Sequence, residues 1–105
     1  MNRSALVLVL LGDLVPGVAR ANTTTREQQS VIARWTGENI CQMGTERFYS
    51  LPEEDVRSMF ERQTSMRYND IPINPSESER NRITAQLTGY ITAVCPAELE
   101  NYRKR

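Results

Sequence analysis

Two cysteines, Cys41 and Cys95, constrain the fold of this chain more than any other feature, since they are the only cysteines among its 105 residues. In an exported chain, a single pair of cysteines favours one intramolecular disulfide over free thiols or a link between chains. The two cysteines are 54 positions apart. In the chain-entropy model, closing a loop of this length contributes about 4 kcal/mol to stability at most. A small domain has a total stability of about 5–10 kcal/mol, so the bridge would supply a large share of it.

The N-terminal segment has the pattern of a secretory signal peptide. Arg3 precedes a short apolar run, Ala5 to Leu11, and the helix-breaking pair Pro16-Gly17 follows the run. Residues 19–21, Ala-Arg-Ala, have the small-x-small form that signal peptidase recognises. The apolar run is too short to span a bilayer, which takes about 20 residues. The alternative to a signal peptide is an N-terminal helix of the core. Pro16-Gly17 would end such a helix.

We therefore expect residues 1–21 to be a cleaved signal peptide and residues 22–105 to form a single small domain, secreted or periplasmic, with no stable membrane anchor. The whole chain carries 13 basic and 13 acidic residues, and cleavage would remove Arg3, Arg20 and Asp13, which leaves a net charge of −1. Nucleic-acid binding requires a basic face, and binding to anionic lipid requires a basic cluster. We expect neither kind of partner.

The first expected helix spans residues 25–43. Thr24 and Glu27 have the spacing of a capping box at its start, and Gly44 is a suitable C-terminal stop. Gly37 destabilises a helix interior by about 1 kcal/mol relative to alanine, so the sequence allows a bend or a break there. An apolar stripe at helical spacing consists of Val31, Ile32, Trp35 and Met43, with Ile40 at its margin.

A second helix is expected over residues 51–67, after a short link that carries Phe48 and Tyr49. Ser50 and Glu53 have capping-box spacing, and the adjacent acids complement the positive end of the helix dipole. These signals make this the most clearly marked helix start in the chain. Its narrow apolar stripe consists of Val56, Met59, Phe60 and Met66.

A third helix is expected to start after the proline-rich segment that ends at Pro75, with Asn74 or Ser76 as its cap. Its apolar stripe consists of Ile83, Leu87, Tyr90, Ile91, Val94 and Cys95. Pro96 ends this helix and can open a short fourth one, Pro96–Tyr102. The last three residues, Arg103 to Arg105, are expected to fray.

These patterns predict an all-α fold, a small bundle of three main helices plus a short C-terminal helix, stapled by one disulfide. Cys41 lies near the end of the first helix, and Cys95 lies at the end of the third. The bridge would therefore join the ends of two helices that are far apart in the sequence.

The composition argues against most catalytic chemistry. The chain has no histidine, which excludes a Ser-His-Asp triad, a Cys-His pair and a histidine-ligated metal. No glycine-rich phosphate loop is present, and the cysteines do not form a C-x-x-C redox motif. Consecutive acids at Glu53, Glu54 and Asp55 point in different directions, unlike the facing carboxylates of a glycosidase. We expect no enzyme activity and no catalytic, cofactor or metal site.

Three residues are candidates for contact with a partner protein, namely Trp35, Ile71 and Ile73. Trp35 is the only tryptophan, and a tryptophan in the middle of an apolar stripe is more often a core anchor than a binding hot spot. Ile71 and Ile73 flank Pro72 in a loop, so they either pack over the core or meet a partner. Packing over the core is the more common outcome for each residue.

Residues 35–40, Trp-Thr-Gly-Glu-Asn-Ile, resemble the Trp-Thr-Cys-acid-acid-aromatic start of the small periplasmic acid-resistance chaperones. Those proteins are also exported, helical, of similar length and closed by one disulfide. Gly37 occupies the family's cysteine position here, and Cys41 follows one helical turn later. The resemblance implies a chaperone that opens under acid stress.

Two functions therefore remain for the exported domain. The first is a non-enzymatic protein that binds another macromolecule, in an inhibitor, immunity-type or envelope accessory role. The alternative is an acid-stress periplasmic chaperone activated by protonation of its carboxylates. That activation requires carboxylates whose pKa is depressed in the folded state.

Overall fold

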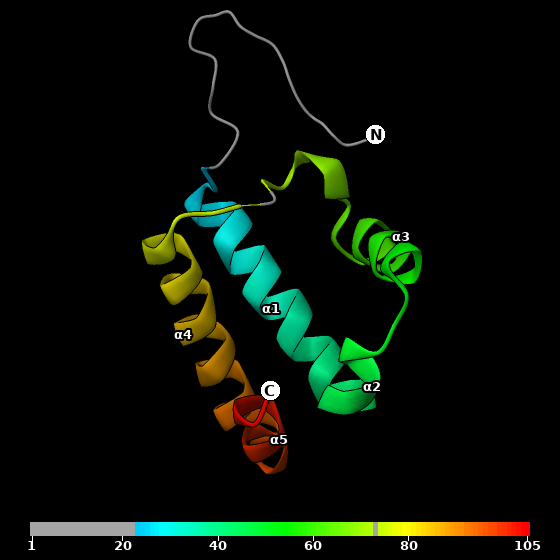
Figure 1. Ribbon diagram of the computed structural model, residues 1–105, viewed down its shortest axis with the longest axis vertical. Helices are drawn as coiled ribbons and strands as arrows, with labels where there is room; N and C mark the ends of the chain where they lie inside the picture. The colour runs from blue at the N-terminus through cyan, green and yellow to red at the C-terminus, as the bar shows by residue number, and fades with distance from the viewer. Residues whose placement is uncertain (1–22, 73) are drawn as a thin grey trace, which may run out of the picture.

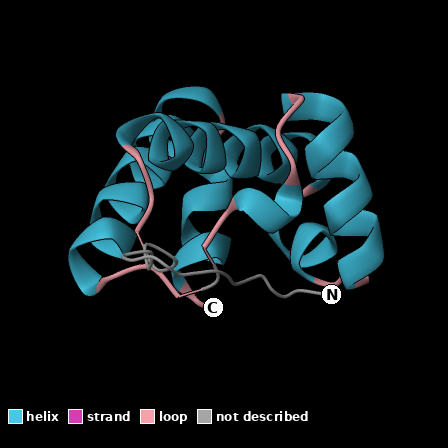
Figure 2. Ribbon diagram, turned by 90° about the horizontal axis from the view of Figure 1, so that it is seen from above, coloured by secondary structure: helices cyan, strands magenta, loops and turns pink. Residues whose placement is uncertain are grey.

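The computed structural model describes residues 23–72 and 74–105, which form an all-α fold with no strand among them (Figures 1 and 2). The α-helices are α1 (Arg26–Met43), α2 (Thr45–Tyr49), α3 (Glu53–Thr64), α4 (Glu77–Val94) and α5 (Leu99–Arg103), with 3₁₀ turns η1 (Tyr68–Asp70) and η2 (Pro96–Glu98). The predicted fold class is confirmed, with three long helices and a short C-terminal helix. The predicted signal peptide, residues 1–21, lies outside the described residues.

The predicted disulfide joins Cys41 in the last turn of α1 to Cys95 directly after α4, with the two Cα atoms 5.6 Å apart. Since both cysteines lie at C-terminal ends, α1 and α4 run parallel, and α2, α3 and η1 return the chain to the start of α4 (Figure 1). A disulfide is consistent with a location in the extracellular space or the periplasm. Within the described part of the chain, no helix has the length and apolar character needed to cross a membrane.

Helix α1 is central, with α4 on one side and α3 on the other (Figure 1). It runs unbroken through Gly37, so the bend that the sequence allows at this glycine does not occur. A Cβ atom on Gly37 would lie 2.5 Å from Cδ2 of Tyr90 on α4. Gly37 therefore lets the backbone of α1 approach the tyrosine ring closely, and its role is in packing.

The buried hydrophobic core comes from all four N-terminal α-helices: Ala33, Trp35, Ile40, Phe48, Phe60, Leu87 and Ile91. The Trp35 ring packs edge-on against Phe48 at 5.5 Å and against Phe60 at 5.2 Å between centroids. Phe48 reaches this cluster because the segment expected to be a link is helix α2, which begins after Gly44 at a φ of 95°. Val94, predicted to face the core, is instead 55% exposed.

Both predicted capping boxes differ from the structure. At α1 the box is formed one residue later than predicted, by Thr25 and Gln28, whose side chains exchange bonds with each other's backbone N–H at 3.0 and 2.9 Å. The box predicted from Ser50 and Glu53 is not formed, because the Ser50 hydroxyl donates to the carbonyl of Arg47 at 2.9 Å. Helix α3 starts after Pro52 without a side-chain cap.

Helix α4 has the cap that the sequence allows, a capping box between Ser76 and Glu79. The C-terminus differs from prediction. The last three residues are expected to fray, but Arg105 packs against the fold. Its guanidinium carbon lies 3.4 Å from the centroid of the Tyr49 ring on α2. That stacking joins the end of the chain to α2.

Candidate functional site

An apolar groove of about 450 Å³ lies between α1, α3 and the segment that contains η1. We call it the α1–α3 groove, and its lining is Ile32, Trp35, Thr36, Val56, Phe60, Tyr68, Ile71 and Pro72. Trp35 and Phe60 are 6% and 3% exposed, so they form its floor, whereas Val56, Tyr68 and Ile71 are half-buried. Apolar and aromatic lining is common in concave binding sites.

The groove brings together two of the three residues that the sequence nominates for partner contact, Trp35 and Ile71. Both also pack in or against the core, which is the outcome that the sequence analysis gives as the more common one. The third residue, Ile73, lies outside the described residues. Sequence analysis missed the contribution of Tyr68, which reaches the groove because η1 folds back against α3 and places its ring 5.8 Å from the Phe60 ring.

The polar edge of the Trp35 indole bonds to a side chain of α3. Its Nε1–H donates to Oε1 of Gln63 at 2.7 Å, and the Asn39 side-chain amide donates to the same oxygen at 3.1 Å. These bonds fix the ring between α1 and α3. The groove floor is therefore preformed.

Two charged side chains of α3, Arg57 and Glu61, are held beside Tyr68 at the edge of the groove, and Oε2 of Glu61 accepts from the Tyr68 backbone N–H at 2.8 Å. The Arg57 guanidinium carbon lies 4.9 Å from the centroid of the Tyr68 ring, and Nη1 donates to Oδ1 of Asn69 at 2.6 Å. Its Nη2 lies 4.0 Å from Oε2 of Glu53, one turn earlier on α3. The lining itself carries no charged residue. Arg57 is therefore a fixed positive charge beside an uncharged surface.

A second feature lies where the N-terminal ends of α1 and α4 meet. The Glu79 carboxylate accepts from the backbone N–H of Thr24 at 3.2 Å and from that of Ser76 at 2.9 Å. We call these contacts the N-terminal clamp. Glu79 is only 8% exposed, and the backbone N–H of Ser76 is the main cause that holds its pKa below the ordinary value of 4.5. One carboxylate thus sits at the positive ends of two parallel helices.

A buried glutamine connects the N-terminal clamp to the surface. Gln29 is 1% exposed, and its amide donates to the carbonyl and the hydroxyl of Thr24 at 3.3 and 3.1 Å. Its Oε1 accepts from Nε of Arg82 on α4 at 3.1 Å. Thr24 is used in these contacts, which explains why the helix cap falls to Thr25.

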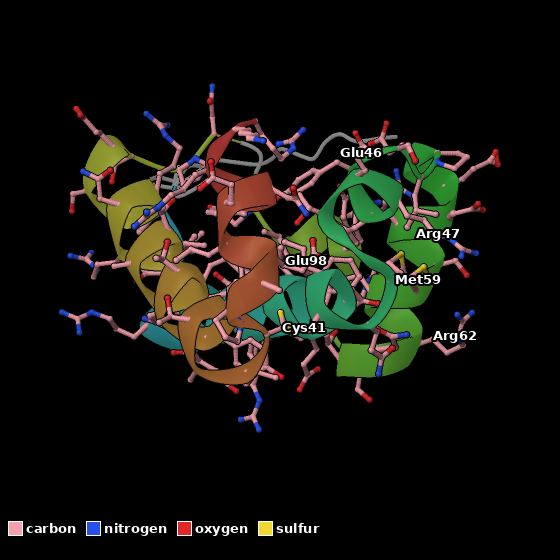
Figure 3. All side chains as sticks on the ribbon, turned by 90° about the horizontal axis from the view of Figure 1, so that it is seen from below. Cys41, Glu46, Arg47, Met59, Arg62 and Glu98 are labelled. Carbon is pink, nitrogen blue, oxygen red and sulfur yellow. A yellow bond between two sulfur atoms is a disulfide. The ribbon has the colours of Figure 1, made fainter. Side chains whose placement is uncertain are left out.

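The opposite end of the fold has a matching carboxylate, Glu98 of η2. Its Oε1 accepts from the backbone N–H of Thr45 at 2.9 Å and from the Thr45 hydroxyl at 2.8 Å. We call this pair the C-terminal clamp. The backbone N–H of Thr45 is the main cause that lowers the pKa of Glu98. Glu98 points toward α2, close to the disulfide (Figure 3).

Glu98 also lines an open polar cleft of about 730 Å³ between α2 and the C-terminal helices, together with residues that include Glu46, Arg47 and Asn101. Its Oε1 already accepts three hydrogen bonds, the third from the Asn101 side-chain amide at 3.3 Å. These bonds join η2 to α2 and α5. Among the described residues, no group of histidine, cysteine, aspartate or glutamate is arranged to hold a metal ion.

Comparison with known proteins finds no family model, no curated protein and no solved structure that matches this chain. The resemblance to the acid-resistance chaperones therefore rests on residues 35–40 alone. In the structure these residues belong to α1, where Trp35 and Ile40 are buried in the core.

Proposed function

We propose that this protein works outside the cytosol by binding another protein, and that the α1–α3 groove is its binding surface. The observation that carries the proposal is the preformed apolar lining of the groove, with a tryptophan fixed at its floor. Aromatic residues in preformed pockets contribute much of the binding energy at protein interfaces. The disulfide supports a role outside the cytosol, because such bonds persist there.

The groove gathers apolar side chains from three elements. The large hydrophobic residues that are exposed elsewhere, Tyr49 and Val94, lie apart on α2 and α4, and Arg105 stacks on the first of them. Scattered exposed apolar residues are ordinary on soluble domains. A groove lined by apolar residues from three elements is not a scatter of single residues, so this explanation does not apply to it.

Site-specific photo-crosslinking in the producing cell tests the proposal. A photoreactive amino acid at Thr36, a half-buried residue of the groove wall, should give a discrete crosslinked species with one protein partner. The same amino acid at Thr92, exposed on α4, is the matched control and should not. Absence of adducts from position 36, or equal adducts from both positions, would refute the groove as the binding surface.

The two clamps favour the alternative function, an acid-activated periplasmic chaperone. Glu79 and Glu98 hold opposite ends of the α1–α4 pair, and the pKa of each is lowered in the folded state by backbone hydrogen bonds. Stability from such groups is present above the unfolded-state pKa and is lost as the pH falls through the folded-state pKa. The Cys41–Cys95 bridge would still join the two helices after both clamps had opened.

The alternative is tested by acidifying the oxidised domain together with an aggregation-prone client protein. Near pH 2–3 the domain should lose near-ultraviolet circular dichroism and should suppress client light scattering. A domain that stays folded at this pH, or that unfolds without protecting the client, would rule out the chaperone function and leave the groove proposal intact.

A further inference from the structure

We propose that the partner segment bound in the α1–α3 groove carries an acidic residue beside its apolar anchor, and that Arg57 receives this carboxylate. The inference rests on the proposed function, since it names the chemistry of the partner at the same groove. It follows from the distribution of charge around the groove.

The wall formed by α1 supplies no charge to the groove. Ile32, Trp35 and Thr36 face it, and at about 100° per residue the charged residues of α1 lie on the other sides of the helix. These residues are Arg26, Glu27, Arg34 and Glu38. Arg34 and Glu38 also bond to each other at 3.3 Å. Charge selectivity must therefore come from α3 or from the segment that contains η1, where Arg67 and Asp70 are exposed.

On the α3 side, Arg57 is prepared to bind a carboxylate. Stacking on Tyr68 and the bond to Asn69 fix the plane of the guanidinium at the groove edge. The guanidinium presents five N–H donors in a fork that matches a carboxylate, and a prepositioned arginine loses little conformational freedom on binding. Its side chain is 38% exposed, so an incoming ligand can reach it.

Glu61 and Glu53 are the competing charges at this edge. The carboxylate of Glu61 is engaged by the Tyr68 backbone N–H at 2.8 Å, and Glu53 is less well placed than Arg57 to select a partner. The Glu53 side chain is 76% exposed, and its contact with Arg57 is long, at 4.0 Å. Exposed ion pairs of this kind contribute little and are readily exchanged. A partner carboxylate can displace Glu53 from Arg57, whereas a basic partner residue would have to approach the fixed guanidinium.

A random 12-residue peptide library displayed on phage, selected on the oxidised mature domain, tests this inference. Wild-type protein should enrich peptides in which Asp or Glu lies within about three positions of an aromatic or aliphatic anchor. Arg57→Glu should remove this preference and enrich Lys or Arg instead. Arg62→Glu is the matched control, because Arg62 is on the same helix but bonds Ser58 away from the groove, and it should select as wild type does.

Synthetic copies of a selected peptide give the quantitative test. Changing the peptide's acid to its amide should weaken binding to wild type by about tenfold, as expected for a charge-assisted contact, and should have little effect on binding to Arg57→Glu. A wild-type preference for basic residues, no charge preference, or an equal effect of Arg62→Glu would overturn the inference. Circular dichroism confirms that each variant is folded.

A groove-filling variant separates this inference from the proposed function. Thr36→Trp should abolish binding of the selected peptides by occupying the groove, with no change of charge. One outcome would refute the role of Arg57 and leave the groove as the binding surface. In that outcome, the selected peptides do not bind Thr36→Trp and show no preference for an acidic residue. Peptides that bind Thr36→Trp as well as wild type would refute both.

Discussion

At the scale of single residues, the two glycines on the long helices α1 and α4 have opposite surroundings. Gly37 is buried and faces Tyr90, whereas Gly89 is exposed and has nothing within 4 Å of the position of its missing Cβ. An alanine favours the helical state over glycine by about 1 kcal/mol at either position. The surroundings therefore decide the net effect of substitution.

We expect Gly37→Ala to lower the free energy of unfolding by about 1–2 kcal/mol, because its Cβ would lie 2.5 Å from the Tyr90 ring and force α1 and α4 apart. Gly89→Ala is the matched control and should raise stability by about 0.5–1 kcal/mol. Urea unfolding followed by Trp35 fluorescence measures both. Equal stabilisation by the two alanines would show that Tyr90 moves aside without cost.

At the scale of elements, the parallel pairing of α1 and α4 places two helix N-termini together, an arrangement in which their positive ends repel. Glu79 relieves this because its carboxylate accepts N–H groups from the start of both helices. The glutamate that forms the capping box with Ser76 thus has a second role. The sequence pattern gives no sign of it, since Thr24 and Glu79 are 55 residues apart.

We expect Glu79→Gln to destabilise the domain at pH 7 and to change its pH dependence. Because the folded-state pKa of Glu79 lies below its ordinary value of 4.5, its contribution is complete above that pH and declines as the pH falls below it. The unfolding midpoints of wild type and Glu79→Gln should therefore differ at pH 7 and converge in acid.

Glu77→Gln is the matched control for that series, because Glu77 lies in the same turn of α4 but is exposed. Its stability curve should follow that of wild type between pH 7 and pH 3. If Glu77→Gln and Glu79→Gln were indistinguishable in urea titrations at each pH, the carboxylate of Glu79 would have no special role in joining the helices.

At the scale of the whole molecule, the disulfide is the covalent link between the two parallel helices. Reduction of the Cys41–Cys95 bridge should lower the free energy of unfolding by about 2–4 kcal/mol, since it frees the long loop in the unfolded chain. Denaturant unfolding of the oxidised and reduced forms measures the difference in an unchanged sequence. Coincident unfolding curves would mean that packing of α1 on α4 alone sets the stability.

Export is the second prediction at this scale. The protein recovered from its producing cell should have the mass of residues 22–105 and should gain two hydrogens on reduction. Intact mass spectrometry with and without reductant checks cleavage and the internal bridge together. A full-length chain with free thiols would remove the basis for a role outside the cytosol.

The sequence by itself determined the three long helices and the covalent link. Apolar stripes at helical spacing, a serine cap at Ser76 and a glycine stop at Gly44 are local signals, and a chain with two cysteines has few ways to pair them. The same local reasoning failed where a side chain has a distant partner. Thr24 bonds to the side chains of Gln29 and Glu79 and therefore does not cap α1.

Only the tertiary structure decided the surface that carries the functional proposal. Trp35, Val56, Tyr68 and Ile71 come from three separate segments, and their meeting in one groove depends on how η1 folds back against α3. Periodicity identifies the apolar face of each helix but carries no information on which faces of different helices meet. The groove and its fixed arginine are therefore properties of the packing, because they arise from contacts between residues that the sequence keeps apart.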